Sequence, residues 1–477
     1  MESYYPQDIN LFTTYRCNSK CQNCLIWKGS EADPYKIELD SEQLERLFDD
    51  PLFVRCTSLG LAGGEPTISP FFWKLLDLLP GGKRVNISTN ALNSEKLVDL
   101  LRRSPYRDKY EIQVSIDGIG DTNDRIRGVK GAFRKSVALL EMLEGLGVDR
   151  LLSFTINRSN YHQLKECYDL ANSHGAEFCT RMAHMGGAYR NRESRGISEF
   201  EENELEVLDN AFDMIISEEL RKSSHFPARL VFMKKITDYF RGIQEDLPCG
   251  ALKTAMVIDL YGDVFPKCPL FMMKGIGNLH EQDLSNIWEG DNASETRARI
   301  DKLQCGGCWN DCQVVTNIAL DREFFEEEYG KLKIAYFRER GFPGVIDFTQ
   351  GEDRLLIGGW YEPEGDSDFR FRWTEQEFSI LLPEGISSLE LFAAVPFTSS
   401  SDGLWRADVL IGGQLVDSVA FSNPEWRHYP IALQRPTSEL TLCKFKLNRY
   451  CCPKDNGMSE DERHLGMAIN KISFMKE

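Results

Sequence analysis

The sequence predicts an α/β fold built on a parallel sheet, followed by a small cysteine-rich module and then by an antiparallel β-sandwich. Three observations predict this order. Short apolar runs alternate with amphipathic helical stretches up to about residue 190, at roughly 30-residue spacing, which is typical of βαβ units. Cysteines then recur between residues 249 and 312, and β-type runs with turn residues fill the chain beyond about residue 345.

The parallel sheet should consist of six strands, at residues 9–15, 57–62, 85–89, 111–116, 151–156 and 177–182. Helices are expected between them, at residues 41–48, 94–101, 132–146 and 161–174. In such a sheet the carboxyl ends of the strands meet at one edge, where barrel enzymes hold their catalytic groups. Functional residues are therefore expected just past the strand ends.

Composition narrows the class of protein. The 477 residues suffice for roughly two or three domains. A net charge of −18, without a basic stripe that alternates with aromatics, argues against a nucleic-acid partner. The sequence has no apolar run of about 18 residues, so no membrane span is predicted, and its start lacks the features of a signal peptide. The 14 cysteines are spaced like metal ligands, so we expect a protein of the reducing cytoplasm.

The most specific motif follows the first expected strand. Cys17, Cys21 and Cys24 have the spacing C-x3-C-x2-C, and no fourth cysteine lies nearby in the sequence. Three thiolates on one short loop can hold three irons of a [4Fe-4S] cube, which leaves the fourth iron open to a small molecule. Zinc binding and chance are the alternatives that this spacing alone leaves open.

Further candidate residues lie at or past the ends of other expected strands. Gly63-Gly64-Glu65-Pro66 follows the second strand, and its two glycines let the backbone approach a ligand closely. Ser115 and Asp117 end the fourth strand. Arg127 follows them, and a guanidinium suits bidentate binding of a carboxylate, although a solvated charge at a helix end is the plain alternative.

Together these residues resemble the radical S-adenosylmethionine (radical SAM) superfamily. The resemblance implies a partial (β/α)6 TIM-like barrel over residues 1–200, in which the three cysteines hold a [4Fe-4S] cluster and SAM binds its open iron. A reductant such as flavodoxin or ferredoxin would supply the electron that splits SAM, and the resulting radical would abstract a substrate hydrogen.

The same resemblance implies roles for individual residues. The segment Gly63, Gly64, Glu65 and Pro66 would bind the SAM amino group, Ser115 would lie near the SAM ribose with Asp117 beside it, and Arg127 would pair with the SAM carboxylate. The sequence departs from the family at Asn23, where an aromatic residue often packs near the adenine. Contacts to the adenine would then come from elsewhere, such as Ile26 or Trp27.

A second cysteine set follows a stretch of expected bridging helices at residues 201–247. It comprises Cys249, Cys268, Cys305, Cys308 and Cys312, with an expected hairpin at residues 257–266. The arrangement resembles the SPASM domain of radical SAM enzymes or its shortened relative, the twitch domain, here over residues 248–320. Because the full SPASM pattern is not met, we expect one auxiliary [4Fe-4S] cluster, held by the first four of these cysteines with Cys312 as a rival ligand. A structural zinc is the alternative.

A helix at residues 321–345 should link this module to an antiparallel, jelly-roll-like β-sandwich at residues 346–477. Three segments weakly resemble β-domains appended to glycan-assembly enzymes: Gly359-Trp360-Tyr361, Phe371-Arg372-Trp373 and Arg463-His464-Leu465-Gly466. That resemblance suggests carbohydrate binding. The tryptophans here, Trp360, Trp373, Trp405 and Trp426, could stack on sugars, but each is expected in the core.

The substrate is open at this point. The β-sandwich favours a small-molecule sugar or a glycan-linked metabolite, which the enzyme would oxidise or epimerise. Peptide modification is the alternative, because many SPASM-type enzymes modify peptides, although no leader-binding winged helix is evident. A scaffold that keeps its clusters without catalysis is a third reading. Arg181 and His184, at the end of the sixth strand, are the candidate substrate contacts, with a surface arginine and a loop histidine as the plain alternative.

Overall fold

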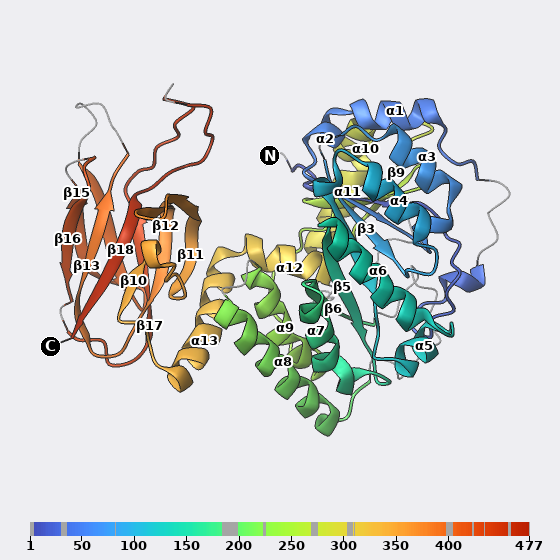
Figure 1. The fold of residues 1–477 in the computed structure, drawn as a ribbon. Coiled ribbons are helices and arrows are strands. Elements are labelled where there is room, and N and C mark those ends of the chain that lie inside the picture. The colour runs from blue at the N-terminus through green and yellow to red at the C-terminus, as the bar shows by residue number, and fades with distance from the viewer. Residues whose placement is uncertain are drawn as a thin grey trace. The chain divides into compact units, whose positions relative to one another are not determined.

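The computed structural model describes residues 4–29, 36–81, 83–183, 199–222, 226–268, 275–302, 309, 311–396, 404–421, 424–433, 435–456 and 459–476. The chain divides into two compact units (Figure 1). Unit 1 comprises residues 1–215 and 232–320, and unit 2 comprises residues 216–231 and 321–477.

Unit 1 begins with six alternating strand and helix segments. The strands are β1 (Asp8–Phe12), β2 (Ser58–Ala62), β3 (Arg84–Thr89), β4 (Tyr110–Ser115), β5 (Asp149–Ile156) and β6 (Glu177–Met182). The helices are α1 (Ser41–Asp49), α2 (Pro51–Arg55), α3 (Pro70–Leu78), α4 (Glu95–Arg103), α5 (Asp121–Arg127), α6 (Ala132–Leu146) and α7 (Leu164–Ser173), with short 3-10 turns η1 (Ile26–Gly29), η2 (Pro66–Ile68), η3 (Arg107–Lys109) and η4 (Tyr161–Gln163).

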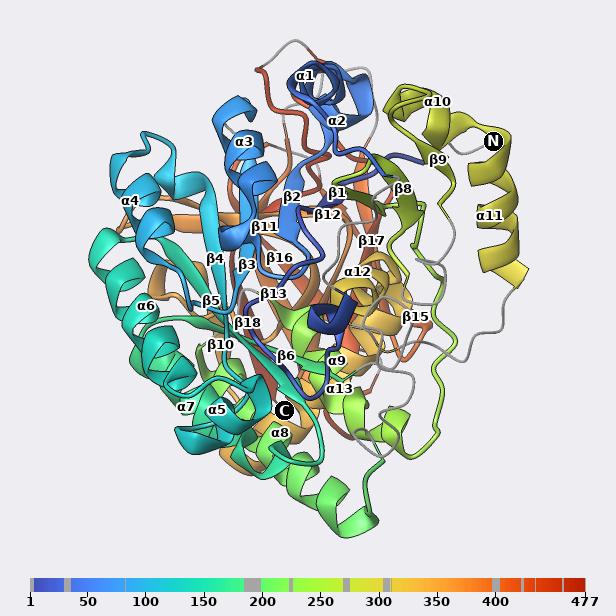
Figure 2. The same ribbon diagram turned by 90° about the vertical axis from the view of Figure 1, so that its right-hand side faces the viewer.

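Neighbouring strands from β1 to β6 pair in parallel and in chain order, as a partial (β/α)6 barrel requires. All six predicted strands are confirmed to within a few residues. Figure 2 shows α3, α4, α6 and α7 along the outer side of these strands. The local sequence explains the helix boundaries. Asp40 and Gln43 form a capping box at the start of α1, and α6 runs between the left-handed Gly131 and Gly147.

The expected hairpin of the second cysteine module is present as β7 (Ala255–Asp259) and β8 (Asp263–Pro266). Gly262 in its turn has φ +79°, which favours glycine. Strand β7 also pairs in parallel with β1, from Asp8 opposite Ala255 to Phe12 opposite Asp259. The hairpin and β9 (Gly277–Asn278) therefore extend the barrel sheet, in the order β6-β5-β4-β3-β2-β1-β7-β8-β9. The sequence did not predict this continuity.

The remaining helices are α8 (Glu202–Lys222), α9 (Pro227–Phe240), α10 (Leu284–Glu289), α11 (Asp291–Lys302), α12 (Asp311–Leu320) and α13 (Arg322–Arg340). Helices α8 and α9 confirm the helical character expected between the barrel and the second cysteine set. None of the described helices is both long and apolar enough to cross a membrane.

Unit 2 holds the predicted antiparallel β-domain. Its strands are β10 (Val345–Asp347), β11 (Leu356–Gly365), β12 (Arg370–Leu382), β13 (Ile386–Ala394), β14 (Trp405–Ile411), β15 (Gln414–Phe421), β16 (Arg427–Ala432), β17 (Thr441–Leu447) and β18 (Ala468–Lys476), with the 3-10 turn η5 (Phe348–Gln350). They form one sheet, in the order β15-β14-β17-β12-β18-β13-β16, with β10 on β18 and β11 on β12. Strands β15 and β16, at its two ends, contact each other, so the sheet is nearly closed (Figure 1).

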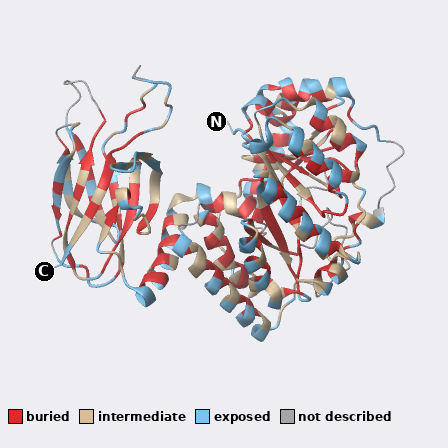
Figure 3. Ribbon diagram, in the orientation of Figure 1, coloured by how far each residue is buried: buried red, intermediate tan, exposed pale blue. Residues whose placement is uncertain are grey.

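The core of the β-domain lies inside this curved sheet, where buried residues alternate with exposed ones along the strands (Figure 3). Trp405 is buried there, as expected. Trp373 and Trp426 are only half-buried and belong to an aromatic cluster on the sheet, in which the rings of Phe371 and Trp426 lie 5.5 Å apart. These two positions therefore leave part of their rings accessible.

Helix α13 packs on the β-domain within unit 2. Its Glu326 is 1% exposed and pairs with Lys444 of β17 at 2.7 Å. Its Lys333 is also buried and donates to the carbonyl oxygens of Arg354 and Leu356. The domain boundary at residue 345 remains a prediction. The ion pair of Glu326 and the hydrogen bonds of Lys333 join α13 to the strands that follow it.

Candidate functional site

The loop that carries Cys17, Cys21 and Cys24 follows β1 and is fixed by backbone hydrogen bonds on both sides. Before the first cysteine, the carbonyl oxygens of Thr14 and Arg16 accept from Gly64 and Glu65 of the loop after β2, at 2.7 and 2.9 Å. Between the cysteines, Lys20 and Gln22 donate to the carbonyl oxygens at the end of α5. The loop geometry is therefore set by two neighbouring barrel segments and not by the loop alone.

Burial disfavours ionisation of the three thiols. It raises the pKa of Cys17 to about 12, with a smaller contribution from Cys21 and Cys24, and it raises the pKa of Cys24 to about 11, with a smaller contribution from Cys21. Burial also raises the pKa of Cys21, while the Arg127 guanidinium, with Nη1 at 3.9 Å from Sγ, opposes that rise. Such a trio is stable as thiolates only beside strong positive charge, which iron would supply.

The donor set fits a cluster better than a single ion. In the described part of the chain, no three His, Cys, Asp or Glu side chains converge as the ligands of one metal ion would. Thiolates that each hold a different iron of a cube need not converge on one point. The three cysteines therefore fit a [4Fe-4S] cluster.

The two glycines after β2 are required by close packing. Gly63 has φ +129°, and a Cβ there would lie 2.4 Å from the carbonyl oxygen of Thr14. A Cβ on Gly64 would lie 2.0 Å from the carbonyl oxygen of Arg16. The backbone approach that the sequence suggested is thus, in this structure, an approach to the cysteine loop itself.

Glu65 is a structural anchor of the site. Its buried carboxylate accepts from the Thr67 hydroxyl at 2.6 Å, the Thr89 hydroxyl at 2.8 Å and the Asn90 backbone N–H at 2.7 Å. Burial raises the pKa of Glu65, and these hydrogen bonds oppose the rise. Pro66 is buried at the start of η2, the turn that Glu65 caps. This carboxylate therefore ties the end of β3 to the loop after β2.

Asn90, which sequence reasoning missed, faces the first cysteine. Its Nδ2 donates to Asn18 at 2.7 Å and lies 3.8 Å from the Cys17 sulfur. The signal available in the sequence was its position directly after β3, at the carboxyl edge of the sheet.

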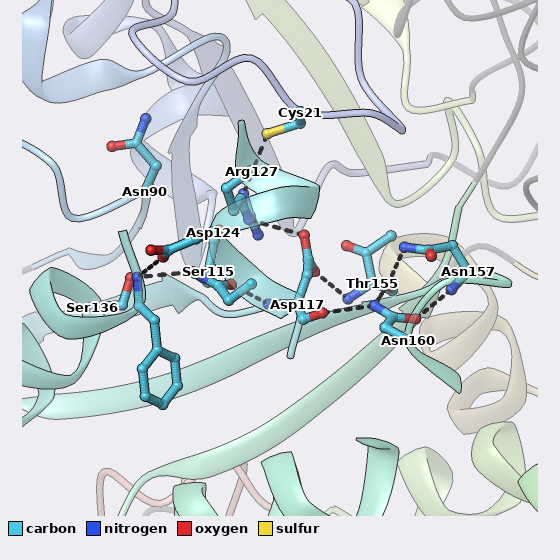
Figure 4. Close-up of polar contacts among 12 residues, drawn as sticks. Cys21, Asn90, Ser115, Asp117, Asp124, Arg127, Ser136, Thr155, Asn157 and Asn160 are labelled. Carbon is cyan, nitrogen blue, oxygen red and sulfur yellow. Dashed lines mark hydrogen bonds and ion pairs between the residues drawn. The ribbon is translucent and has the colours of Figure 1, made fainter. Parts of the chain in front are cut away.

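Asp117 and Arg127 form a buried ion pair beside the cysteine loop (Figure 4). Arg127 Nε lies 2.9 Å from Asp117 Oδ2, and the two side chains are 13% and 1% exposed. Asp117 Oδ1 also accepts from the Thr155 backbone N–H at 2.8 Å. In the described residues, Nη2 of Arg127 has no hydrogen-bond partner, so it fits a ligand carboxylate.

Ser115 is the last residue of β4, on the same edge of the sheet (Figure 4). Its carbonyl oxygen accepts from Ser136 at 3.5 Å. Asn160, which sequence reasoning also missed, supports this region by donating to the carbonyl oxygens of Asp117 and Thr155, both at 2.9 Å. The strand ends near the proposed SAM residues are therefore held in a connected network.

Arg181 lies on β6, as predicted, and is half-buried. Its Nη2 lies 3.2 Å from Asp311 Oδ2 at the start of α12 and 3.3 Å from Gln113 Oε1 of β4. The buried Cys179 lies 3.5 Å from the same carboxylate. Arg181 is therefore joined to the second cysteine module within unit 1. His184 lies outside the described residues.

The second cysteine set is described in part. Cys249 and Cys268 are half-buried, Cys305 and Cys308 lie outside the described residues, and so does the side chain of Cys312. Gly250 donates to Asn317 of α12 at 3.0 Å, and a Cβ there would lie 2.8 Å from Gln313. Cys249 is thus held next to the helix that carries Cys312 in its first turn.

A phenol–carboxylate pair lies between the two cysteine segments. Tyr15, two residues before Cys17, donates to Asp259 at the end of β7 at 2.9 Å. Burial raises the pKa of Asp259 to about 6, and the neighbouring Asp263 carboxylate adds to this rise. The hydrogen bond from Tyr15 opposes it. The pair joins the loop after β1 to the hairpin of the second module.

Two family models match this chain. The first, described as the radical SAM superfamily, matches residues 11–171. The second, SPASM, described as an iron–sulfur cluster-binding domain, matches residues 249–313. The two matches coincide with the barrel and with the second cysteine set.

Curated relatives cover more of the chain. Mycofactocin maturase MftC of Mycobacterium tuberculosis is 28% identical over 349 residues, 69% of this chain and 85% of the relative. The sporulation killing factor maturation protein SkfB of Bacillus subtilis is 28% identical over 227 residues, 47% of this chain and 51% of the relative. Fe-coproporphyrin III synthase of Methanosarcina barkeri is 30% identical over 221 residues, 46% of this chain and 53% of the relative.

Proposed function

Because the chain belongs to the radical SAM superfamily and carries a SPASM domain, we propose that it is a maturation enzyme that modifies a peptide. Its cofactors are SAM, a SAM-binding [4Fe-4S] cluster and an auxiliary iron–sulfur cluster. When bound, SAM and its cluster supply the 5′-deoxyadenosyl radical that abstracts a substrate hydrogen.

The observation that carries the peptide proposal is the similarity to the mycofactocin maturase, because it spans 85% of that relative. The sporulation killing factor protein, also named for maturation, supports the same reading. None of the three relatives above is named for sugar chemistry, so the sugar oxidation or epimerisation that the sequence favoured loses its preference. The synthase relative makes a tetrapyrrole the second substrate class to test, over a smaller share of the chain.

We assign the residues of unit 1 as follows. Cys17, Cys21 and Cys24 hold the SAM-binding cluster, and Arg127 holds the SAM carboxylate through its unpartnered nitrogen while Asp117 fixes its orientation. Ser115 lies on the ribose side of the site, and residues 63–66 hold the amino group.

Two further assignments concern the substrate and the second cluster. Arg181 lies at the end of β6 with five N–H donors, and we propose that it receives a carboxylate or backbone carbonyl of the peptide. Cys249 and Cys268, with ligands from residues 305–312, hold the auxiliary cluster. Oxygen-sensitive clusters need a reducing compartment, which we propose is the cytoplasm, with flavodoxin or ferredoxin as the reductant.

The test uses the full chain with both clusters reconstituted anaerobically. It is incubated with SAM, dithionite and synthetic peptides encoded by small reading frames beside its gene. We expect a defined mass change in one peptide, with 5′-deoxyadenosine formed in proportion. When the modified residue of that peptide carries deuterium, the deuterium should appear in the 5′-deoxyadenosine. The variant with Cys17, Cys21 and Cys24 changed to Ala should do neither, whereas Cys443→Ala, a buried cysteine of the β-domain, should behave as wild type.

A different result would overturn the proposal. If SAM is cleaved and every such peptide stays unchanged, while coproporphyrin or a nucleotide sugar is converted, the substrate is not a peptide.

A further inference from the structure

Unit 2 contains a pocket that is lined by none of the residues assigned above to the radical chemistry. Its volume is about 470 Å³, within the range of small-molecule sites. The residues that define its chemistry are Arg322 of α13, Tyr361 of β11, Glu375 of β12, and Tyr450, Arg463 and His464 from the segment between β17 and β18. All of them belong to unit 2.

One wall of the pocket is aromatic without being part of a core. The rings of Tyr450 and His464 are stacked, with centroids 4.3 Å apart, yet Tyr450 is 45% exposed. Tyr361 donates to the carbonyl oxygen of His464, and the Arg463 guanidinium lies 5.3 Å from the Tyr361 ring centre. These rings therefore present flat, ordered faces to a ligand, and burial of apolar surface does not explain them.

The other wall is charged but compensated. Arg322 pairs with Glu375 at 2.9 Å, and Arg463 pairs with both Glu364 and Asp461 at 2.7 Å. The lining also includes Glu377 and Glu462, which pair with Lys446 and Lys454. Its carboxylates outnumber its two arginines, but each charged group of the lining has a partner, so donors and acceptors lie side by side. An anionic ligand would need an unpaired cation, which the lining does not supply from its two arginines.

The pocket is preorganised by close backbone crossings. Gly359 has φ +79°, and a Cβ there would lie 2.1 Å from the carbonyl oxygen of Glu377 and 2.6 Å from the Arg322 guanidinium. A Cβ on Gly466 would lie 2.4 Å from the carbonyl oxygen of Glu375. Arg322 is further fixed by Glu326 at 2.9 Å, itself buried and paired with Lys444. Both walls are thus held in place before a ligand arrives.

We propose that this pocket binds a neutral saccharide. The C–H face of a sugar ring would lie on the Tyr450–His464 pair, and its hydroxyls would donate to Glu375 while accepting from Arg322 or Arg463. A hydroxyl is both donor and acceptor, so it suits a lining in which each guanidinium lies beside a carboxylate. This site is separate from the proposed peptide-modifying site, and either can fail without the other.

The test measures saccharide binding by the full, cluster-loaded chain. An array of neutral mono- and oligosaccharides ending in glucose, galactose, mannose, rhamnose or N-acetylglucosamine identifies the ligand, and calorimetry gives its Kd. We expect Tyr450→Ala and Glu375→Gln each to raise Kd at least tenfold. Two matched controls should change Kd less than twofold: Tyr106→Ala, a similarly exposed tyrosine in a cavity of unit 1, and Glu390→Gln, a half-buried carboxylate on β13 that pairs with His428.

Melting temperature and SAM cleavage are measured on each variant, and both should stay close to wild type because none of the altered side chains lies in a core. The proposal is overturned if no neutral saccharide binds, if binding survives both pocket substitutions, or if Tyr106→Ala abolishes it. It is also overturned if inorganic phosphate or an acidic peptide displaces the sugar from the pocket, because the site would then select charge.

Discussion

The buried pair of Arg127 and Asp117 allows a quantitative test of how the cysteine loop is supported. Arg127→Met keeps an unbranched side chain in place of the arginine stem but removes the guanidinium, which leaves the Asp117 carboxylate, 1% exposed, without its partner. Breaking a buried pair from one side typically costs about 3–5 kcal/mol of unfolding free energy, because the remaining charge is uncompensated.

The double variant Arg127→Met/Asp117→Asn should recover much of that loss. An asparagine keeps an oxygen for the Thr155 N–H, which the carboxylate accepts at 2.8 Å, and removes the unpaired charge. Asp117→Asn is measured as the second single variant. We expect the sum of the unfolding free energies lost in the two single variants to exceed the loss in the double variant by about 2 kcal/mol or more. As a matched control, Arg102→Met breaks a pair of similar length, 2.8 Å, whose side chains are 60% and 57% exposed, and should cost at most about 0.5 kcal/mol.

The measurement is anaerobic urea unfolding of the iron-loaded chain, followed by far-ultraviolet circular dichroism, with the slope on denaturant checked in every variant. If the loss in the double variant equals the sum of the two single losses within about 0.5 kcal/mol, the coupling of Arg127 and Asp117 is refuted, because the effects of substitutions at independent sites are additive. SAM affinity, measured separately, should fall in both Arg127 variants and stay unchanged in Arg102→Met.

Three further predictions concern the same unit. Gly64→Ala should lower iron content and SAM cleavage, because the added Cβ would lie 2.0 Å from the Arg16 carbonyl oxygen. The control is Gly145→Ala in α6, where no atom lies within 4 Å of the added Cβ. This control should leave stability unchanged or raise it by up to about 1 kcal/mol. Changing Cys17, Cys21 and Cys24 together to Ala should remove about half of the iron and leave the auxiliary cluster in place. An iron assay and electron paramagnetic resonance would measure this. Loss of all iron would contradict the proposal that the two clusters occupy separate sites. The pKa of Asp259 is raised to about 6 in the folded protein, so its contribution to stability is present at low pH and is lost as pH rises through about 6. When pH falls from 7 to 4.5, the unfolding free energy of wild type should therefore gain about 2 kcal/mol relative to that of Asp259→Asn. Thermal melts of the two proteins with the same dependence on pH would exclude this.

The regular elements of the barrel were predictable because each is encoded locally. Strand β6 and helix α6 have the predicted bounds, and α6 is delimited in the sequence by Gly131 and Gly147, both left-handed. In the β-domain, the sequence predicted the antiparallel class of the sheet but not the individual strands β10 and β18. Strand β18 follows a long polar segment and alternates less clearly, so its place between β12 and β13 comes from tertiary pairing.

The site was predictable where a motif carries the chemistry and not where packing does. The cysteines were singled out by their spacing, and Asp117 and Arg127 by the resemblance to the radical SAM superfamily. The structure brings Cys21, Asp117 and Arg127 together. Asn90 was missed because a lone asparagine after a strand has no distinctive pattern. The backbone bonds from Lys20 and Gln22 to α5 were equally hidden, because any residue can make them.

The parallel pairing of β1 with β7 has a consequence for synthesis of the chain. Strand β1 ends at Phe12, but its partner Asp259 is made about 250 residues later, so one edge of β1 stays unpaired while most of unit 1 emerges from the ribosome. The barrel sheet and the hairpin beside the auxiliary cysteines can therefore be completed only together, late in translation. A ribosome that stalls before residue 255 would release a chain with an open strand edge, prone to aggregation and unable to assemble the second cysteine module.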